Sequence, residues 1–285
     1  MARPDRPVLN IVGCGRAART LAKLWAGAGP CVIGSVLTRS PASAQDAVSF
    51  IEQGRAVAGF DEMRPAALWM LGVPDRDIAT AAAVLAASGC VRAGDGVFHL
   101  SGFTPSAALA PLAEVGARIA SVHPVMSFAD PALAAGRFAG TPCGVEGETT
   151  LAAELATLFA AIGAQCFALD GSKKPLYHAG SVFASNFLVV ILDAARRAYV
   201  DAGVPPETAD AMLAAISRGA LENVLALGGP NALTGPAARG DREVVALQQG
   251  VVSAWDADAG RAYRELSTLA FALAARRDAA EPGTQ

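Results

Sequence analysis

The sequence predicts an α/β protein, in which an N-terminal Rossmann-type domain with a mostly parallel sheet precedes an all-helical C-terminal domain. Short β-rich runs alternate with Ala- and Leu-rich helical runs from residue 8 to about residue 169, and this alternation is typical of a parallel sheet with helices on both faces. A glycine-rich turn follows the first β-rich run, and the β-rich runs end before Gly171. We therefore expect a dinucleotide-binding domain at residues 1–169 and a helical domain at residues 170–285.

The expected strands are short apolar runs bounded by Gly, Pro or Asp. They lie at residues 9–12, 31–37, 68–72, 96–99, 118–121, 142–145 and 166–168. Helical periodicity predicts helices between most of them, at residues 16–28, 77–87, 105–114 and 151–162. The C-terminal domain is predicted to contain helices at residues 176–202, 206–227, 242–255 and 258–276. Because ligands bind beyond the carboxyl ends of such strands, the residues that follow the strands are the candidates for a site.

Composition excludes several classes of protein. Hydrophobic residues make up 53% of the chain, charged residues make up 17%, and the net charge is −3, so we expect neither a disordered chain nor a basic surface for nucleic acid or membranes. The five cysteines are widely spaced and contain no CxxC pair, so we expect a reduced, cytoplasmic protein without a metal site. The most apolar run, residues 182–192, is short and is interrupted by Ser185 and Asn186. It is predicted to be a buried helix and not a membrane span.

The turn after the first strand has the dinucleotide-binding pattern G-x-G-x-x-A, formed by Gly13, Gly15 and Ala18. The first glycine permits a tight turn, the second lets the backbone approach a pyrophosphate, and the small third residue allows the helix to pack closely on the strand. Free N–H groups at the start of the helix attract anions. We therefore expect Gly13, Gly15, Arg16 and Ala18 to hold a pyrophosphate, with a merely tight turn as the alternative.

The residues after the second strand indicate NADP in preference to NAD. An NAD site usually has an acidic residue there for the ribose hydroxyls, but this chain has Thr38, followed by Arg39 and Ser40. A guanidinium and a hydroxyl suit a 2′-phosphate. An ordinary exposed loop arginine is the alternative for Arg39. The missing acid also disfavours an S-adenosylmethionine-binding sheet.

The three histidines lie at the ends of elements. His99 and His123 follow strands, and His178 lies on the first helix of the C-terminal domain, so all three are expected near a crevice between domains, where small ligands bind. Lys174 precedes His178 by four residues, which places both on one helix face. Lys174 is a candidate acid or electrostatic stabiliser, although Lys173 leaves the choice of lysine open. His178 and His123 are candidates to orient the substrate or relay its proton, and His99 is a candidate substrate-binding residue.

Three further segments supply candidate ligand contacts. Val73 and Pro74 follow the strand at residues 68–72, and Ser101 and Gly102 come after His99, so we expect all four to line the cofactor crevice, with Ser101 and Gly102 on its nicotinamide side. Arg239 lies in the bent loop LTGPAARGD. It either binds a substrate carboxylate or pairs with Asp241.

Six motifs together resemble one protein family over nearly the whole chain. They are GCGRAA, LGVPD, FHLSG, SVHPVMSF, KKPLYHAGSVFASNF and LTGPAARGD. In this order they resemble the Rossmann-like proteins with a C-terminal DUF2520 domain, which are similar to pyrroline-5-carboxylate reductases, β-hydroxyacid dehydrogenases and prephenate dehydrogenases. The resemblance implies an NAD(P)-dependent oxidoreductase whose helical domain commonly dimerises.

Two departures from the relatives' motifs leave the substrate open. Lys174 matches the lysine of the K-x-x-[ND]-N helix of β-hydroxyacid dehydrogenases, but Tyr177 and His178 replace its last two residues. His123-Pro124 resembles the HP pair of prephenate dehydrogenases, but the glycine that usually follows is absent. The expected function is therefore a homodimeric NADPH-dependent reductase, or the reverse dehydrogenase, of a small carboxylate with a C=O or C=N group. A non-catalytic dinucleotide sensor and a methyltransferase are the alternatives.

Overall fold

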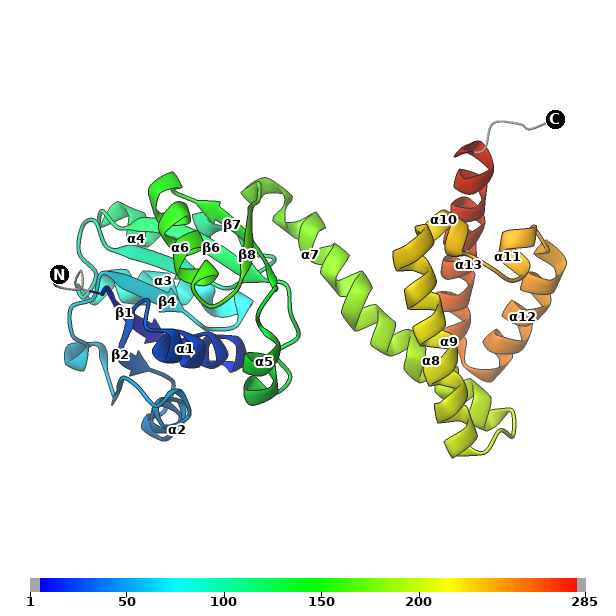
Figure 1. Ribbon diagram of the computed structural model, residues 1–285, viewed down its shortest axis with the longest axis horizontal. Helices are drawn as coiled ribbons and strands as arrows, with labels where there is room; N and C mark the ends of the chain where they lie inside the picture. The colour runs from blue at the N-terminus through cyan, green and yellow to red at the C-terminus, as the bar shows by residue number, and fades with distance from the viewer. Residues whose placement is uncertain (1–5, 281–285) are drawn as a thin grey trace. The chain divides into compact units, whose positions relative to one another are not determined.

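Predominantly apolar runs such as VLNIV and LWML form central strands of one sheet whose two faces are both covered by helices. The computed structural model describes residues 6–280, and it divides the chain into two units, Met1–Phe183 and Ala184–Gln285 (Figure 1). The strands of the first unit are β1 (Val8–Val12), β2 (Val32–Leu37), β3 (Arg55–Val57), β4 (Leu68–Leu71), β5 (Gly96–His99), β6 (Arg118–Pro124), β7 (Pro142–Gly147) and β8 (Gln165–Ala168).

The sheet has the order β3-β2-β1-β4-β5-β6-β7-β8. Neighbouring strands pair in parallel except β6 and β7, which are antiparallel. The chain order reverses between β1 and β4, and the carboxyl ends on either side of such a switch form the usual ligand crevice of these sheets. The predicted α/β fold class with a helical C-terminal part is confirmed.

Helices form a layer on each face of the sheet. The helices of the first unit are α1 (Arg16–Ala28), α2 (Pro41–Ile51), α3 (Ile78–Ala87), α4 (Ala110–Glu114), α5 (Pro131–Arg137), α6 (Thr149–Ala160) and α7 (Lys174–Val182). One core cluster joins α1, α2 and α6 to the sheet, and a second joins α3 and α4 to the opposite face. In the first, the rings of Trp25, Phe98 and Phe159 meet edge to face with centroids 5.1–6.5 Å apart, which fixes α1 and α6 against β5.

The second unit consists of helices in the described residues. They are α8 (Leu188–Asp201), α9 (Pro206–Leu227), α10 (Gly229–Ala232), α11 (Pro236–Arg239), α12 (Arg242–Trp255) and α13 (Ala257–Ala280). A π-helical stretch, Phe183–Phe187, connects α7 to α8. The two units divide after Phe183, later than the boundary predicted near residue 170, because the side chain of Lys174 on α7 is buried in the first unit.

The prediction of a buried helix at residues 182–192 is wrong. Val189 and Val190 are 67% and 64% exposed, and they belong to a helical run, Gly171–Asp201, that is long and apolar enough by length and composition to cross a membrane. Among the described residues of the second unit, the buried apolar residues are Ala209, Val245 and Ala274. This unit therefore buries very little apolar surface by itself.

Candidate functional site

The turn between β1 and α1 requires glycine at its first position. Gly13 has a φ of +76°, and a Cβ there would lie 2.4 Å from Cγ1 of Val73, so no other residue fits without strain. Its N–H donates to the carbonyl of Leu37 at 2.7 Å, and the N–H of Gly15 donates to the carbonyl of Gly72 at 3.3 Å. These bonds hold the turn between the ends of β2 and β4.

The start of α1 is open to an anion. Gly15 is the N-cap, its position provides no side-chain cap, and the first turn contains no acidic residue, so the first N–H groups of the helix are available to a phosphate. Arg16 is exposed at this end. Ala18 is buried instead, because a Cβ on Gly72 would lie only 2.5 Å from the Cβ of Ala18. Ala18 therefore allows close packing of α1 on β4, and it is not among the residues that line the pocket described next.

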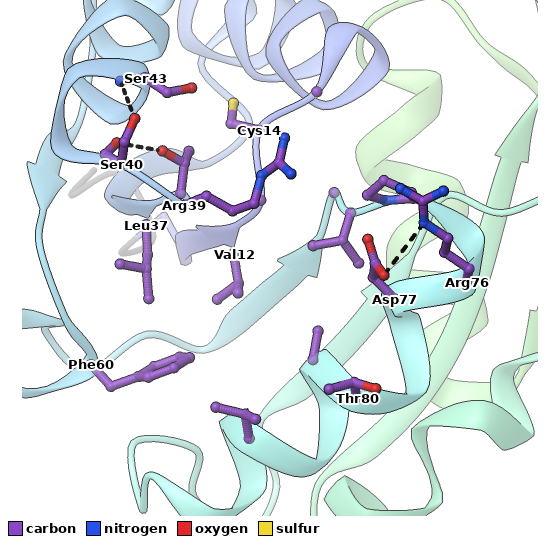
Figure 2. Close-up of a pocket in the computed structure, with 18 residues that line it drawn as sticks. Val12, Cys14, Leu37, Arg39, Ser40, Ser43, Phe60, Arg76, Asp77 and Thr80 are labelled. Atoms are coloured by element: carbon purple, nitrogen blue, oxygen red, sulfur yellow. Dashed lines mark hydrogen bonds and ion pairs between the residues drawn. The ribbon is translucent and has the colours of Figure 1, made fainter.

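A pocket of about 790 Å³ opens beyond the ends of β1, β2 and β4 (Figure 2). It contains the glycine turn, the loop after β2 and the start of α3. Its lining residues are Val12, Gly13, Cys14, Gly15, Leu37, Thr38, Arg39, Ser40, Ser43, Phe60, Gly72, Val73, Pro74, Arg76, Asp77, Thr80, Ala81 and Val84. Two phosphate-binding predictions, at the glycine turn and at Arg39 and Ser40, thus fall in one cavity of a size that suits a small-molecule ligand.

Arg39 is the unpaired cation of this pocket among the residues that the structure describes. Its side chain points into the pocket (Figure 2), and no ion pair to it is formed within residues 6–280. Arg76, on the opposite wall, lies 3.7 Å from Asp77 instead. Ser40 caps α2 by accepting a hydrogen bond from the N–H of Ser43, which leaves its hydroxyl proton free to donate.

Sequence reasoning missed part of the pocket wall. Ser43, Phe60 and Thr80 line the cavity, but none of them stands in a recognised motif. The start of the helix that contains Ser43 could be predicted from the sequence, because Ser40 is a typical N-cap and Pro41 is a typical first helical residue. Phe60 begins a short 3-10 helix, Phe60–Glu62, that follows the three-residue strand β3, and its place in the pocket wall depends on the tertiary fold.

Lys174 is fully buried, and all its donors are engaged. Its Nζ donates to the carbonyl of Ser101 at 2.8 Å and to the hydroxyl of Ser121, and it lies 3.5 Å from Oε1 of Glu146. An ammonium has three protons, so none is left for a ligand in this arrangement. Burial lowers the pKa of Lys174, and the Glu146 carboxylate opposes that shift. The exposed Lys173 makes no comparable contact with the fold.

His99 is also used within the protein. It is fully buried; its Nδ1 accepts the N–H of Ser101 at 3.2 Å, and its Nε2 lies 3.3 Å from the carbonyl of Pro105, to which it donates. The hydroxyl of Ser101 in turn accepts the N–H groups of Phe103 and Thr104 at 3.1 and 2.8 Å. The turn after β5 thus uses both side chains to fix its own shape, and the structure does not present His99 or the Ser101 hydroxyl to a ligand.

The other two histidines lie together beside Tyr177. Nδ1 of His123 is 2.8 Å from the hydroxyl of Tyr177, and the rings of His123 and His178 meet at 78° with centroids 5.6 Å apart. Burial, with the nearby His178 and Lys174, lowers the pKa of His123 to about 4, and burial raises the pKa of Tyr177 to about 12. Nδ1 of His178 is buried without a hydrogen-bond partner. Sequence reasoning assigned no role to Tyr177.

Arg239 lies in the second unit, where its Nε is 3.1 Å from Oδ2 of Asp241. Of the two predicted roles, the structure shows this pairing. Within the described residues, no three His, Cys, Asp or Glu side chains come together as metal ligands.

Comparison with known proteins gives two family matches. A Rossmann-like domain matches residues 1–124, and DUF2520, a domain of unknown function, matches residues 141–270. No curated protein matches the chain significantly.

Solved structures share the fold over almost the whole chain. The protein TM1727 from Thermotoga maritima is 26% identical with a TM-score of 0.72, and the match covers 95% of this chain and 99% of that one. BF3122 from Bacteroides fragilis, a candidate NADP oxidoreductase, is 22% identical with a TM-score of 0.75, covering 94% and 98%. Pyrroline carboxylate reductase from Plasmodium falciparum, solved with NADP bound, is 13% identical with a TM-score of 0.57, covering 94% and 100%.

Proposed function

We propose that this chain is an NADP-dependent oxidoreductase. It belongs to the proteins in which a DUF2520 domain follows a Rossmann-like domain. The family resemblance of its motifs is confirmed by the two matches. Its substrate is a small carboxylate with a C=O or C=N group, or the corresponding hydroxy or amino acid. The observation that carries this proposal is that one pocket contains both a helix start without a side-chain cap and an arginine that forms no ion pair within residues 6–280. The NADP-linked neighbours BF3122 and the Plasmodium reductase support the same reading.

The residues of the pocket fit NADP. The first N–H groups of α1, beside Gly13, Gly15 and Arg16, would bind the pyrophosphate. Arg39 and Ser40 would bind the 2′-phosphate through charge-assisted hydrogen bonds. The apolar side chains of Phe60 and Val84 offer a surface for the adenine, and Val73 and Pro74 also line the pocket. When bound, the cofactor supplies or accepts the hydride.

A titration tests the cofactor. NADPH and NADH are titrated separately into wild type, Arg39→Ala and the control Arg76→Ala, with nicotinamide fluorescence as the readout. Loss of a charge-assisted hydrogen bond costs about 1.5 to 3 kcal/mol, so Arg39→Ala is expected to weaken NADPH roughly 10- to 100-fold and to leave NADH unchanged. Arg76→Ala, which removes a guanidinium already next to Asp77, is expected to change either affinity little. Equal weakening of both nucleotides, or no binding of either by wild type, contradicts the proposal.

We assign the substrate's proton to His178. Lys174 and His99 have no free donor, and His123 stays neutral because its pKa is about 4. During reduction the hydride adds to the carbonyl or imine carbon, the π electron pair moves to the oxygen or nitrogen atom, and that atom takes a proton from Nδ1 of protonated His178, which becomes a neutral imidazole. Oxidation reverses each transfer. Lys174 supplies a positive charge next to the turn after β5 and holds the carbonyl of Ser101.

The second function to be weighed is a dinucleotide sensor without catalysis. It needs the same pocket but no proton donor, and the buried, fully bonded Lys174 is compatible with it. Incubation with NADPH and a panel of 2-keto acids and cyclic imines distinguishes the two functions. Oxidation of NADPH by any member supports the oxidoreductase, and nucleotide binding without turnover across the panel supports the sensor.

The protein is further proposed to be a cytoplasmic homodimer that associates through its helical unit. Leu225 on α9 and Val251 on α12 are 78% and 71% exposed, and a groove of about 340 Å³ is lined by apolar side chains of α12 together with Gln248 and Tyr263. Apolar surface on this scale marks a contact site. A second copy of the chain would cover it.

A further inference from the structure

We propose that Tyr177 is a positioning residue for His123, and that Nε2 of His123 and Nδ1 of His178 form a two-point hydrogen-bonding site over Gly102 for the reacting oxygen or nitrogen atom of the substrate. This inference rests on the proposed oxidoreductase function. It assigns new roles to Tyr177 and Gly102. All four residues belong to the first unit.

The direction of the Tyr177–His123 hydrogen bond follows from the acidity of the two groups. Burial raises the pKa of Tyr177 to about 12, and burial together with nearby His178 and Lys174 lowers that of His123 to about 4, so both are neutral at pH 7. A phenol is a much stronger acid than a neutral imidazole N–H, so the hydroxyl donates to Nδ1 across the 2.8 Å contact. A neutral imidazole that accepts at Nδ1 carries its proton at Nε2. His123 therefore presents a fixed donor.

The hydroxyl of Tyr177 is itself held in place. A Cβ on Gly144 of β7 would lie 3.2 Å from this hydroxyl and 3.3 Å from the ring of Phe167. The ring of Tyr177 also meets those of His123 and Phe167 at centroid distances of 5.4 and 6.2 Å. Contacts from β6, β7 and β8 thus fix the donor that orients His123.

Gly102 lies where the two histidines converge. A Cβ at this position would lie 2.7 Å from Nε2 of His123 and 2.6 Å from Nδ1 of His178. A ligand atom would not occupy the Cβ position itself, which is one bond length from the Gly102 Cα, but the two distances bring the two nitrogens close enough together for both to hydrogen bond to one atom beside that position. Nδ1 of His178 is buried and has no partner within the described residues, so an incoming oxygen or nitrogen atom would satisfy it.

The turn that contains Gly102 is rigid. Lys174 holds the carbonyl of Ser101, His99 holds the N–H of Ser101, and the Ser101 hydroxyl holds the next two N–H groups. Lys174 and His178 lie one helical turn apart on α7 and contact adjacent residues of this turn. The site over Gly102 is therefore prepared before a ligand arrives.

The tautomer of His123 is the direct test for Tyr177. Long-range ¹H–¹⁵N spectra of protein labelled at the histidine rings are recorded at pH 7, without nucleotide, for wild type and Tyr177→Phe. His123 is expected as the Nε2–H tautomer in wild type and as a mixture of tautomers in Tyr177→Phe. The Nε2–H form of His99, which bonds to Pro105, is expected to be unchanged in both. An Nδ1–H form of His123 in wild type, or an unchanged spectrum in the variant, overturns the role of Tyr177.

The two-point site is tested with oxamate, a 2-keto acid analogue that is not reduced. In the presence of NADP⁺, saturating oxamate is expected to shift the ¹⁵N signals of His123 Nε2 and His178 Nδ1 in wild type and in Gly136→Ala, whose added Cβ meets no atom within 4 Å. Gly102→Ala is expected to abolish both shifts. Wild type that binds NADP⁺ but shows neither shift overturns the two-point site, whereas loss of nucleotide binding would instead contradict the proposed function.

Discussion

The ammonium of Lys174 and the imidazole of His178 lie on one helix face but differ in their hydrogen bonding. Nζ of Lys174 donates hydrogen bonds to Ser101 and Ser121 and forms an ion pair with Glu146. Nδ1 of His178, in contrast, has no hydrogen-bond partner in the described residues. A buried, fully paired charge stabilises a local shape. A nitrogen without a partner is instead free to exchange a proton with a ligand.

Replacement of His178 by Asn tests whether His178, and not Lys174, is the proton donor. Asn can still hydrogen bond near the position of Nδ1 but cannot transfer a proton at neutral pH, so kcat with a reducible probe is expected to fall roughly 10²- to 10⁴-fold. NADPH affinity is expected to stay within about threefold of wild type, since the nucleotide pocket does not include His178. Lys173→Ala, which changes the exposed neighbour of Lys174, is the control and is expected to keep wild-type kcat. Unchanged kcat in His178→Asn removes its assignment as proton donor.

The burial of His99 makes stability depend on pH. Burial, with the charge of Lys174, lowers its pKa from the ordinary 6.5 to about 4, so below pH 6.5 the unfolded chain binds a proton that the folded chain does not. The contribution of His99 is therefore fully present above pH 6.5 and is lost as the pH falls towards 4.

The expected size of this loss is about 2 kcal/mol of unfolding free energy between pH 7 and pH 5. It is measured by denaturant unfolding at both pH values in wild type and in His99→Asn, which keeps an acceptor for the N–H of Ser101 but does not titrate. His123, whose pKa is lowered in the same way, contributes the same sign in both proteins. A pH dependence of equal size in the variant contradicts the assignment to His99.

The elements around the nucleotide pocket show what can be predicted from sequence. Strands β1, β4 and β5 are predominantly apolar runs between turn residues, so their places are predictable from pattern alone. β3 is only three residues long and begins with an exposed arginine, so it has no alternation to detect. The helices α2 and α5 are also absent from the prediction, although Ser40 and Asp130 cap them and a proline follows each cap.

The side-chain network around the turn after β5 is predictable only in part. The four-residue spacing of Lys174 and His178 indicates that both face one side of a helix, and both do reach the turn at Ser101 and Gly102. Their different environments do not follow from that spacing. Glu146, which lies beside the ammonium, is 28 residues earlier in the chain, on a strand whose antiparallel pairing the local sequence does not encode.

The β1–α1 turn is the element on which cofactor binding depends most directly. Gly13→Ala is expected to destabilise the protein by about 1 to 3 kcal/mol, because its φ of +76° is unfavourable for alanine and the new Cβ would collide with Val73. NADPH binding should weaken with it. Gly27→Ala, at an exposed position of the same helix where a Cβ meets no atom within 4 Å, is expected to be neutral or stabilising. Thermal unfolding with and without NADPH compares the two, and equal effects would show that the turn geometry is not the cause.

At the scale of the whole molecule, the two units differ in how they are stabilised. The first has large clusters on both faces of its sheet, whereas in the described part of the second only Ala209, Val245 and Ala274 are buried apolar residues. A helical unit of this size with so small a core needs further apolar burial to be stable. Association with a second copy would supply it.

Sedimentation velocity tests the association. Wild type is expected to sediment as a dimer, and Val251→Glu, which places a charge on the exposed apolar face of α12, is expected to shift the population towards monomer. Leu133→Glu, at an exposed position on α5 of the first unit, is the control and is expected to remain dimeric. A wild-type monomer at all concentrations, or recovery of the protein in the membrane fraction, contradicts a cytoplasmic dimer.

The small core of the helical unit has a consequence for how the protein responds to dilution. Association shifts apparent stability by mass action, so the melting temperature of the helical unit should rise with protein concentration, while that of the sheet unit should not. NADPH, which is proposed to bind the first unit, should raise the melting temperature of that unit alone. At low protein concentration and with NADPH bound, the helical unit would therefore unfold at a lower temperature than the unit that contains the nucleotide pocket.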